Sequence, residues 1–125
     1  MRSQDWIKKA NEDVLVAKHL INVSPANSAY HSQQAVEKYL KAFLIVNNVD
    51  PPKTHNIYYL LRLCTDIDNE FNYLKKLNTQ KLTKYSYVRY PVDLEISSKD
   101  AREAIEIAEK VREFVLKKLE KEKNK

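Results

Sequence analysis

Apolar residues recur at intervals of three or four along most of the 125-residue chain. This is the spacing of one buried face of an α-helix. Prolines at positions 25, 51, 52 and 91 separate the segments that carry the pattern, because proline interrupts the helical hydrogen-bond ladder. The pattern predicts an all-α protein, an antiparallel up-down bundle of four long helices plus one short helix.

The first two predicted helices form a hairpin around Pro25. The first starts after Ser3, a residue type favoured as an N-cap, and the second starts at Asn27 or Ser28. Asparagines 47–48 and the two prolines that follow end the second helix. The predicted buried faces are Trp6, Ala10, Val14, Ala17 and Ile21 in the first helix, and Ala29, Val36, Leu40, Phe43 and Leu44 in the second.

Three further elements are predicted in the second half. A short helix is capped by Thr54 or Asn56, and a fourth helix gives way near Tyr87, because Pro91 disfavours helical geometry in the residue before it. Residues 89–96 are predicted as a loop, and Ser97 or Ser98 caps the last helix. The apolar residues of these helices are Ile57, Leu60, Leu61 and Cys64; Phe71, Leu74, Leu77, Leu82 and Tyr85; and Ala101, Ala104, Ala108, Val111 and Val115.

The domain prediction follows from length and charge pattern. A chain of this size forms one domain, and we assign residues 1–117 to the bundle. Residues 118–125 mix basic and acidic side chains, which is typical of a charged helix end or a frayed tail. A small bundle with apolar side chains left over on a flat face commonly finds a partner. The side chains left over from the predicted faces include Ile7, Ile45, Ile107, Phe114 and Leu116.

Composition excludes several classes of site. The chain has no glycine, so phosphate loops of the Walker or Rossmann type cannot be built. A single cysteine, Cys64, forms neither an internal disulfide nor a thiolate zinc cluster. The three histidines are far apart in sequence and lack metal-site spacing, so no metal or other cofactor is predicted. No apolar run is long enough to cross a membrane, and we expect a cytoplasmic protein without membrane contact.

A polar stripe on the second predicted helix is the first candidate site. His31, Gln34, Lys38 and Lys41 follow one another at steps of three, four and three residues. They therefore share a face, and Lys41 also lies four residues after Glu37, at ion-pair spacing. One interpretation is a solvated helix face, and the other is a row of donors for phosphate or base edges. The net charge of +5 permits a nucleic-acid ligand without requiring one.

Two further segments offer functional side chains. His55 lies at or just before a predicted helix start, where it acts either as a capping residue or as a ligand-contacting or proton-transfer group. The segment 85–91 holds Arg89, Tyr90 and two more tyrosines. Such residues stack on and hydrogen-bond to nucleotides, but tyrosines are also common at protein interfaces.

Taken together, these segments resemble the HEPN domain, an all-α family found beside minimal nucleotidyltransferases and in toxin–antitoxin, antiviral and RNA-cleaving systems. The resemblance extends from Trp6 to about Leu116. It is carried by Trp6, Ala10, Asp13 and Ala17, by His31 and the segment 34–42, by Pro52, Thr54-His55 and Leu60-Leu61, by Arg89-Tyr90-Pro91, and by Ala101 and Ala104.

The resemblance implies a bundle of four or five helices that commonly forms homodimers, with a cleft for a nucleotide or RNA. The nuclease members of the family use an arginine followed four to six residues later by a histidine. Arg89 has no such histidine after it, and His55 is the last histidine of the chain. Nuclease activity is therefore not carried over, and no catalytic residue is assigned.

Three hypotheses follow. The first is a module that binds a nucleotide or RNA, or docks a nucleotidyltransferase partner, as a member of a toxin–antitoxin type pair. Its predicted ligand-binding residues are Gln34, Lys38, Lys41, His55, Arg89 and Tyr90. The second is a metal-independent endoribonuclease that uses His55 or His31 as acid and base beside Arg89. The third is a purely structural interaction bundle.

Overall fold

The computed structural model describes residues 2–91 and 93–123, and these residues form helices and connecting segments without a β-strand. The predicted all-α bundle is confirmed. Met1, Val92 and residues 124–125 of the predicted tail lie outside the described residues. Within the described part, no helix is long and apolar enough to cross a membrane.

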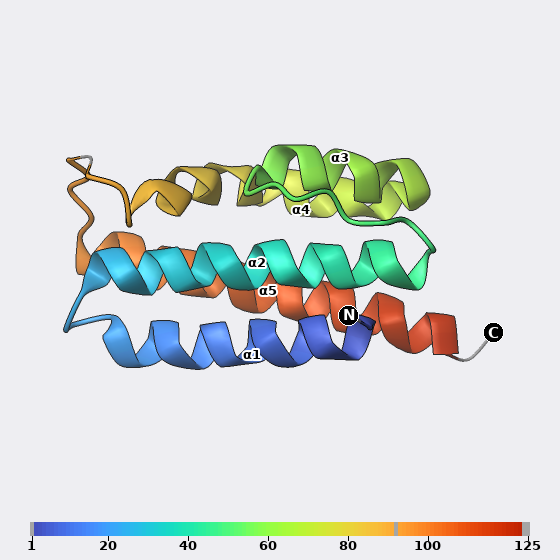
Figure 1. The fold of residues 1–125 in the computed structure, drawn as a ribbon, viewed down its shortest axis with the longest axis horizontal. Helices are drawn as coiled ribbons and strands as arrows, with labels where there is room; N and C mark the ends of the chain where they lie inside the picture. Colours follow the sequence, from blue (N-terminus) through green and yellow to red (C-terminus); the bar gives the residue numbers. More distant parts are fainter. Residues whose placement is uncertain (1, 92, 124–125) are drawn as a thin grey trace.

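Three long helices form the body of the bundle: α1 (Ser3–Leu20), α2 (Pro25–Val46) and α5 (Ser98–Lys123). In Figure 1, α1 runs antiparallel to α2, whereas α2 and α5 point the same way. The most extensive packing is between α1 and α2 and between α2 and α5, and α2 also packs against the segments that follow it. Helix α2 is therefore the central element of the fold.

The remaining segments cover α2 from the other side. They are α3 (Ile57–Ile67), the short 3₁₀ turn η1 (Asn69–Phe71), α4 (Asn72–Lys76) and the 3₁₀ segment η2 (Thr79–Tyr87). The connection between α2 and α3, green in Figure 1, runs back along α2. As a result, α3 points the same way as α2, and η1, α4 and η2 return in the opposite direction.

The predicted fourth long helix is broken into these short pieces. Asn78 adopts a left-handed backbone conformation with φ of 61° and lies between α4 and η2. A residue in this conformation ends an α-helix, and glycine normally fills the position. In this glycine-free chain asparagine takes it instead, and Asn48 does the same after α2 with φ of 60°.

The helix starts agree with the sequence at α3 and α5. At α1 the N-cap is Arg2 rather than Ser3, and α2 also differs. Asn56 accepts the N–H of Tyr59 at the start of α3, and Ser97 and Asp100 cap α5 reciprocally. At the start of α2 the cap is Ser24 rather than Asn27 or Ser28. Pro25 is the first residue of α2 instead of the end of α1, because proline is well suited to the first helical position.

The core lies between α2, α5 and the α3–η2 layer. Phe71 contacts both Phe43 and Phe114, with ring centroids 4.4 and 4.9 Å apart. Each large side chain buried in this way contributes about 2 kcal/mol. Ile107 is buried and Ile7 packs against the core. Ile107 therefore belongs to the core, and Ile7 and Phe114 pack against it, so these three side chains are not left over as predicted. The dimer itself stays a prediction.

The end of α5 is tied to the α3–η1 connection. Lys118 Nζ lies 2.8 Å from both Asp68 Oδ2 and Glu70 Oε1. Although partial desolvation raises the pKa of Asp68, hydrogen bonds from Lys118 and from the Glu70 N–H lower it below its usual value. Desolvation lowers the pKa of Lys118, but the two carboxylates raise it overall. The first residue of the predicted tail thus contacts the bundle.

Candidate functional site

Asp13 joins α1 to the polar stripe of α2. Its Oδ1 lies 2.9 Å from His31 Nδ1, and its Oδ2 lies 2.5 Å from Lys38 Nζ. His31 and Lys38 are two helical turns apart, so a single carboxylate between them contacts both. Asp13 is buried, and the side chains of His31 and Lys38 are partly exposed. The pair of α1 and α2 therefore presents an oriented imidazole and an ammonium group at its surface.

Asp13, His31 and Lys38 form the Asp13 centre, and Glu37 organises a second group of polar side chains further along α2. Its Oε1 accepts a hydrogen bond of 2.7 Å from Lys41 Nζ, and its Oε2 lies 3.0 Å from His55 Nδ1. The buried amide of Gln33 donates to the same oxygen at 3.0 Å and to the backbone carbonyl of His55 at 3.2 Å. Gln34 in turn donates to Gln33 at 2.7 Å. These bonds fix the segment before α3 against α2.

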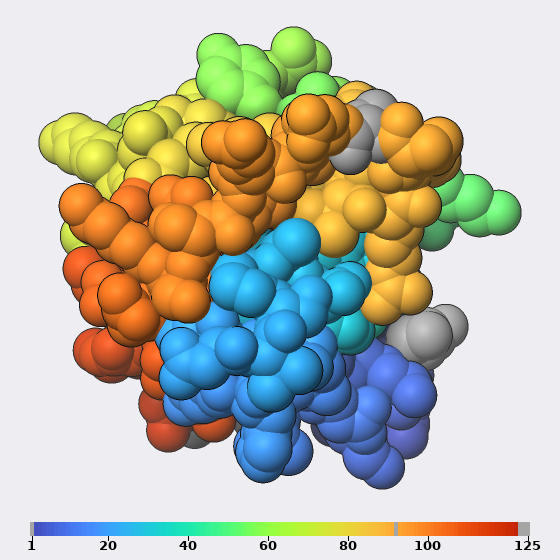
Figure 2. All heavy atoms as spheres, turned by 90° about the vertical axis from the view of Figure 1, so that its left-hand side faces the viewer, coloured from blue at the N-terminus to red at the C-terminus, as the bar shows by residue number. Residues whose placement is uncertain are grey.

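Arg89 reaches the Asp13 centre from the end of η2. Its guanidinium lies 4.4 Å above the ring of Tyr30, and its Nη2 lies 3.5 Å from His31 Nε2. Arg89 is exposed, and within residues 2–91 and 93–123 no carboxylate pairs with it. Figure 2 shows the end of the bundle where the orange segment around residue 90 lies beside the light-blue connection of α1 and α2.

The structure distributes five of the six predicted ligand-binding residues over these two groups, which together form the polar surface of α2. Lys38 and Arg89 lie with Asp13 and His31. Gln34, Lys41 and His55 lie with Gln33 and Glu37, and Lys41 is buried there. Tyr90 stands apart, because it is 59% exposed and, in the described part of the chain, its ring contact is with Tyr87 at 6.0 Å. Of the two histidines that the sequence offers as a partner for Arg89, His31 rather than His55 lies beside it.

The sequence interpretation missed the two carboxylates that organise this surface. Asp13 shares the apolar face of α1 with Ala10, Val14 and Ala17. An acidic residue on a buried face requires a partner, and this signal was available in the sequence. Glu37 was assigned its ion pair with Lys41 correctly, but the bonds to His55 and Gln33 depend on the tertiary fold.

The donor set of this surface is suited to anions. The carboxylates of Asp13 and Glu37 each pair with a lysine and a histidine. The guanidinium of Arg89 has no carboxylate partner in the described part of the chain. Arginine binds phosphate through two parallel hydrogen bonds. Among the described residues, no group of three histidine, cysteine or acidic side chains lies close enough to hold a metal ion.

Comparison with known proteins identifies the fold family. A sequence model described as the HEPN domain matches residues 3–120. The chain belongs to the HEPN family. Two solved structures share this HEPN fold over 94% of the chain and 98% of their own lengths: ST0689, described as an archaeal HEPN homologue, with 28% identity and a TM-score of 0.75, and TT1696 from Thermus thermophilus, with 25% identity and a TM-score of 0.73.

One curated relative carries a functional description. A protein named "Putative toxin MJ1304" from Methanocaldococcus jannaschii is 51% identical to this HEPN chain over 45 residues. The match spans 35% of the chain and 30% of the relative. The chain therefore aligns with less than a third of that relative's length.

Proposed function

We propose that this HEPN protein binds the phosphodiester backbone of RNA on the surface formed by His31, Lys38 and Arg89, as a member of a toxin–antitoxin type pair. The observation that carries the proposal is the exposed guanidinium of Arg89, which stacks on Tyr30 without a carboxylate partner in the described chain. Phosphate contacts by arginine and lysine supply most of the affinity of proteins for nucleic acids. The relative named as a toxin supports the wider context.

The binding test is fluorescence anisotropy of a labelled single-stranded RNA at several salt concentrations. We expect Arg89→Ala and Lys38→Ala each to lower the affinity roughly five- to tenfold and to reduce the salt dependence. Lys110→Ala is the matched control, because it removes one positive charge from an exposed position of α5. Equal affinity of all three variants and the wild type rejects the proposal.

A second candidate function is metal-independent RNA cleavage, which the alignment of Asp13, His31 and Arg89 favours. Asp13 holds Nδ1 of His31, so that Nε2 points to Arg89. A neutral Nε2 would take the proton of a ribose 2′-hydroxyl as its oxygen attacks the adjacent phosphorus. The bond to the 5′-oxygen then breaks, a water molecule protonates that oxygen, and Arg89 stabilises the charge on the phosphate.

The cleavage test is incubation of unstructured RNA with the protein in the presence of a metal chelator. We expect products with 2′,3′-cyclic phosphate ends, and we expect His31→Ala to abolish them while His55→Ala retains them. His55 is the matched control because it is also hydrogen-bonded to a carboxylate but is not beside Arg89. Absence of cleavage rejects this second candidate and leaves the binding proposal intact.

Two partner predictions belong to the same proposal. The protein forms a homodimer, and it docks a minimal nucleotidyltransferase. Size-exclusion chromatography with light scattering tests the first prediction, because a single peak with the mass of one chain contradicts it. Co-elution with the product of the adjacent gene tests the second, provided that this gene encodes a nucleotidyltransferase.

A further inference from the structure

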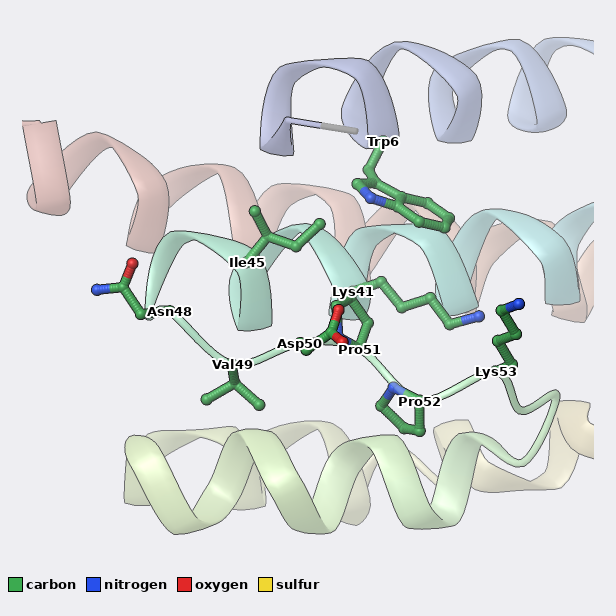
Figure 3. A pocket seen from close by; sticks show the side chains of 9 residues that line it. All are labelled: Trp6, Lys41, Ile45, Asn48, Val49, Asp50, Pro51, Pro52 and Lys53. Carbon is green, nitrogen blue, oxygen red and sulfur yellow. The ribbon is translucent and has the colours of Figure 1, made fainter.

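A cavity of about 480 Å³ lies between the start of α1, the last turns of α2 and the segment that leads to α3. Its volume is within the range of small-molecule and cofactor sites. Figure 3 shows the indole of Trp6 on one side and the rings of Pro51 and Pro52 on the other. None of the functions considered above uses this cavity.

The walls of the cavity combine flat apolar surfaces with positive charge. Trp6, Pro51 and Pro52 supply the flat surfaces, Lys41 and Lys53 supply ammonium groups, and Asp50 adds one carboxylate. The indole Nε1 of Trp6 is buried and has no acceptor among the described residues. A planar ring system matches these walls better than an aliphatic chain, because indole faces favour stacking.

The cavity adjoins the residues grouped around Glu37 through Lys41. Lys41 lines the cavity and also donates to Glu37, and its Nζ lies 5.5 Å from the centroid of the Trp6 indole ring. Lys38 is about 4.5 Å earlier along the axis of the same helix. Lys38, which belongs to the proposed RNA-binding surface, and Lys41, which lines the cavity, are thus within one helical turn of each other on α2.

We propose that this cavity is a nucleobase subsite, in which one base of the bound RNA stacks on Trp6 against Pro51 and Pro52. The inference rests on the proposed RNA binding. It adds a stacking contact with a base to the contacts with the phosphodiester backbone. Stacking on an aromatic side chain tolerates any base. The subsite should therefore raise the affinity for an oligomer with bases above the affinity for an abasic oligomer of the same length.

The test uses Trp6 itself, because it is the sole tryptophan of the chain. A short oligoadenylate and an abasic oligomer of the same length are titrated into the wild-type protein while its fluorescence is recorded. We expect oligoadenylate to quench Trp6 and to bind roughly five- to tenfold more tightly than the abasic oligomer. We expect Arg89→Ala to lower the affinity for both oligomers to a similar extent.

Two variants then assign the difference to the cavity. The affinities of the variants are measured by anisotropy of labelled oligomers, because the Trp6 variants lack tryptophan. Trp6→Leu and Pro52→Ala are each expected to remove the preference for oligoadenylate without changing the affinity for the abasic oligomer, whereas Trp6→Phe retains the preference. Circular dichroism verifies that each variant is folded, and the two substitutions affect different walls. Equal binding of both oligomers with unchanged fluorescence overturns the subsite alone. Absence of binding by both oligomers overturns the proposed RNA binding as well.

Discussion

His31 Nε2 lies 3.5 Å from Arg89 Nη2, although 58 positions separate the two residues in the sequence. The family pattern places a histidine shortly after the arginine, and this chain has none there. The fold instead brings a histidine from α2 to the arginine, and Asp13 sets its orientation. An imidazole therefore lies beside the guanidinium of Arg89, but it comes from a helix that precedes Arg89 in the sequence.

The ring of Tyr30 is predicted to hold Arg89 in position for RNA. Tyr30→Leu removes the π-face beneath the guanidinium, which is 4.4 Å away, and we expect RNA affinity to fall about two- to fivefold. Tyr30→Phe keeps the face and should bind like the wild type. Anisotropy titrations of both variants measure the effect, and equal losses for leucine and phenylalanine contradict the stacking role.

The two Glu–Lys pairs at i,i+4 spacing are predicted to differ strongly in energy. The side chains of Glu37 and Lys41 are only 6% and 8% exposed, whereas those of Glu113 and Lys117 are 68% and 71% exposed. Lys41→Met leaves a buried carboxylate without its cation and should cost about 3 kcal/mol. Lys117→Met should cost no more than about 0.5 kcal/mol.

Urea unfolding of the two methionine variants compares these costs directly. The double variant Glu37→Gln/Lys41→Met should regain a large part of the lost stability, because no unpaired charge remains in the interior. Similar costs at positions 41 and 117 would falsify the assignment of burial as the source of the difference.

The stability of the protein is predicted to depend on pH through Asp68 and Lys118. Although desolvation raises the pKa of Asp68, hydrogen bonds from Lys118 and from Glu70 N–H lower it below its usual value. The carboxylate of Asp68 therefore adds its full contribution to the free energy of unfolding above about pH 4, and this contribution disappears as the pH falls further. The pKa of Lys118 is raised, so its contribution is complete below about pH 10 and disappears as pH rises through the raised value.

Asp68→Asn isolates this contribution. We expect the variant to be about 1 kcal/mol less stable than the wild type between these limits, and the difference to shrink in acid as Asp68 of the wild type takes up a proton. Thermal or urea unfolding across the pH range measures the difference. A gap between wild type and variant that stays constant down to pH 2 would contradict the ion pair as its cause.

The left-handed conformation of Asn78 predicts an inversion between two substitutions. At position 78, with φ of 61°, Asn78→Ala should cost about 1 kcal/mol and Asn78→Gly about nothing. At Asn72, where φ is −57°, alanine should be better than glycine by roughly 0.5–1 kcal/mol. Urea midpoints of the four variants test the inversion, and the same order at both positions would refute it.

The helical bundle could be predicted from periodicity because most of its helices bury a continuous face. The exception is the segment from Phe71 to Tyr85, whose apolar spacing also suits the tighter turns of 3₁₀ structure, and the break at Asn78 depends on a single backbone conformation. Only the absence of glycine hinted that an asparagine would take this position.

The candidate site was predictable where its members share one helix. His31, Lys38 and Lys41 follow from helical spacing alone. The position of Arg89 beside His31 depends on how η2 returns along the bundle, which no local pattern specifies. Tyr90 follows Arg89 directly, yet neighbouring residues of a turn project in different directions, and it does not reach the network within the described chain.

The central place of α2 has a consequence for control of this protein. Helix α2 is packed by α1, α3, η2 and α5, so its backbone amides should exchange with deuterium only when the whole domain opens. Because the polar surface is built on this centrally packed helix, switching it off by rearrangement would require unfolding the domain. Any inhibitor of this surface would therefore have to cover it, and a partner that did so would mask Arg89 while leaving the exchange pattern of α2 unchanged.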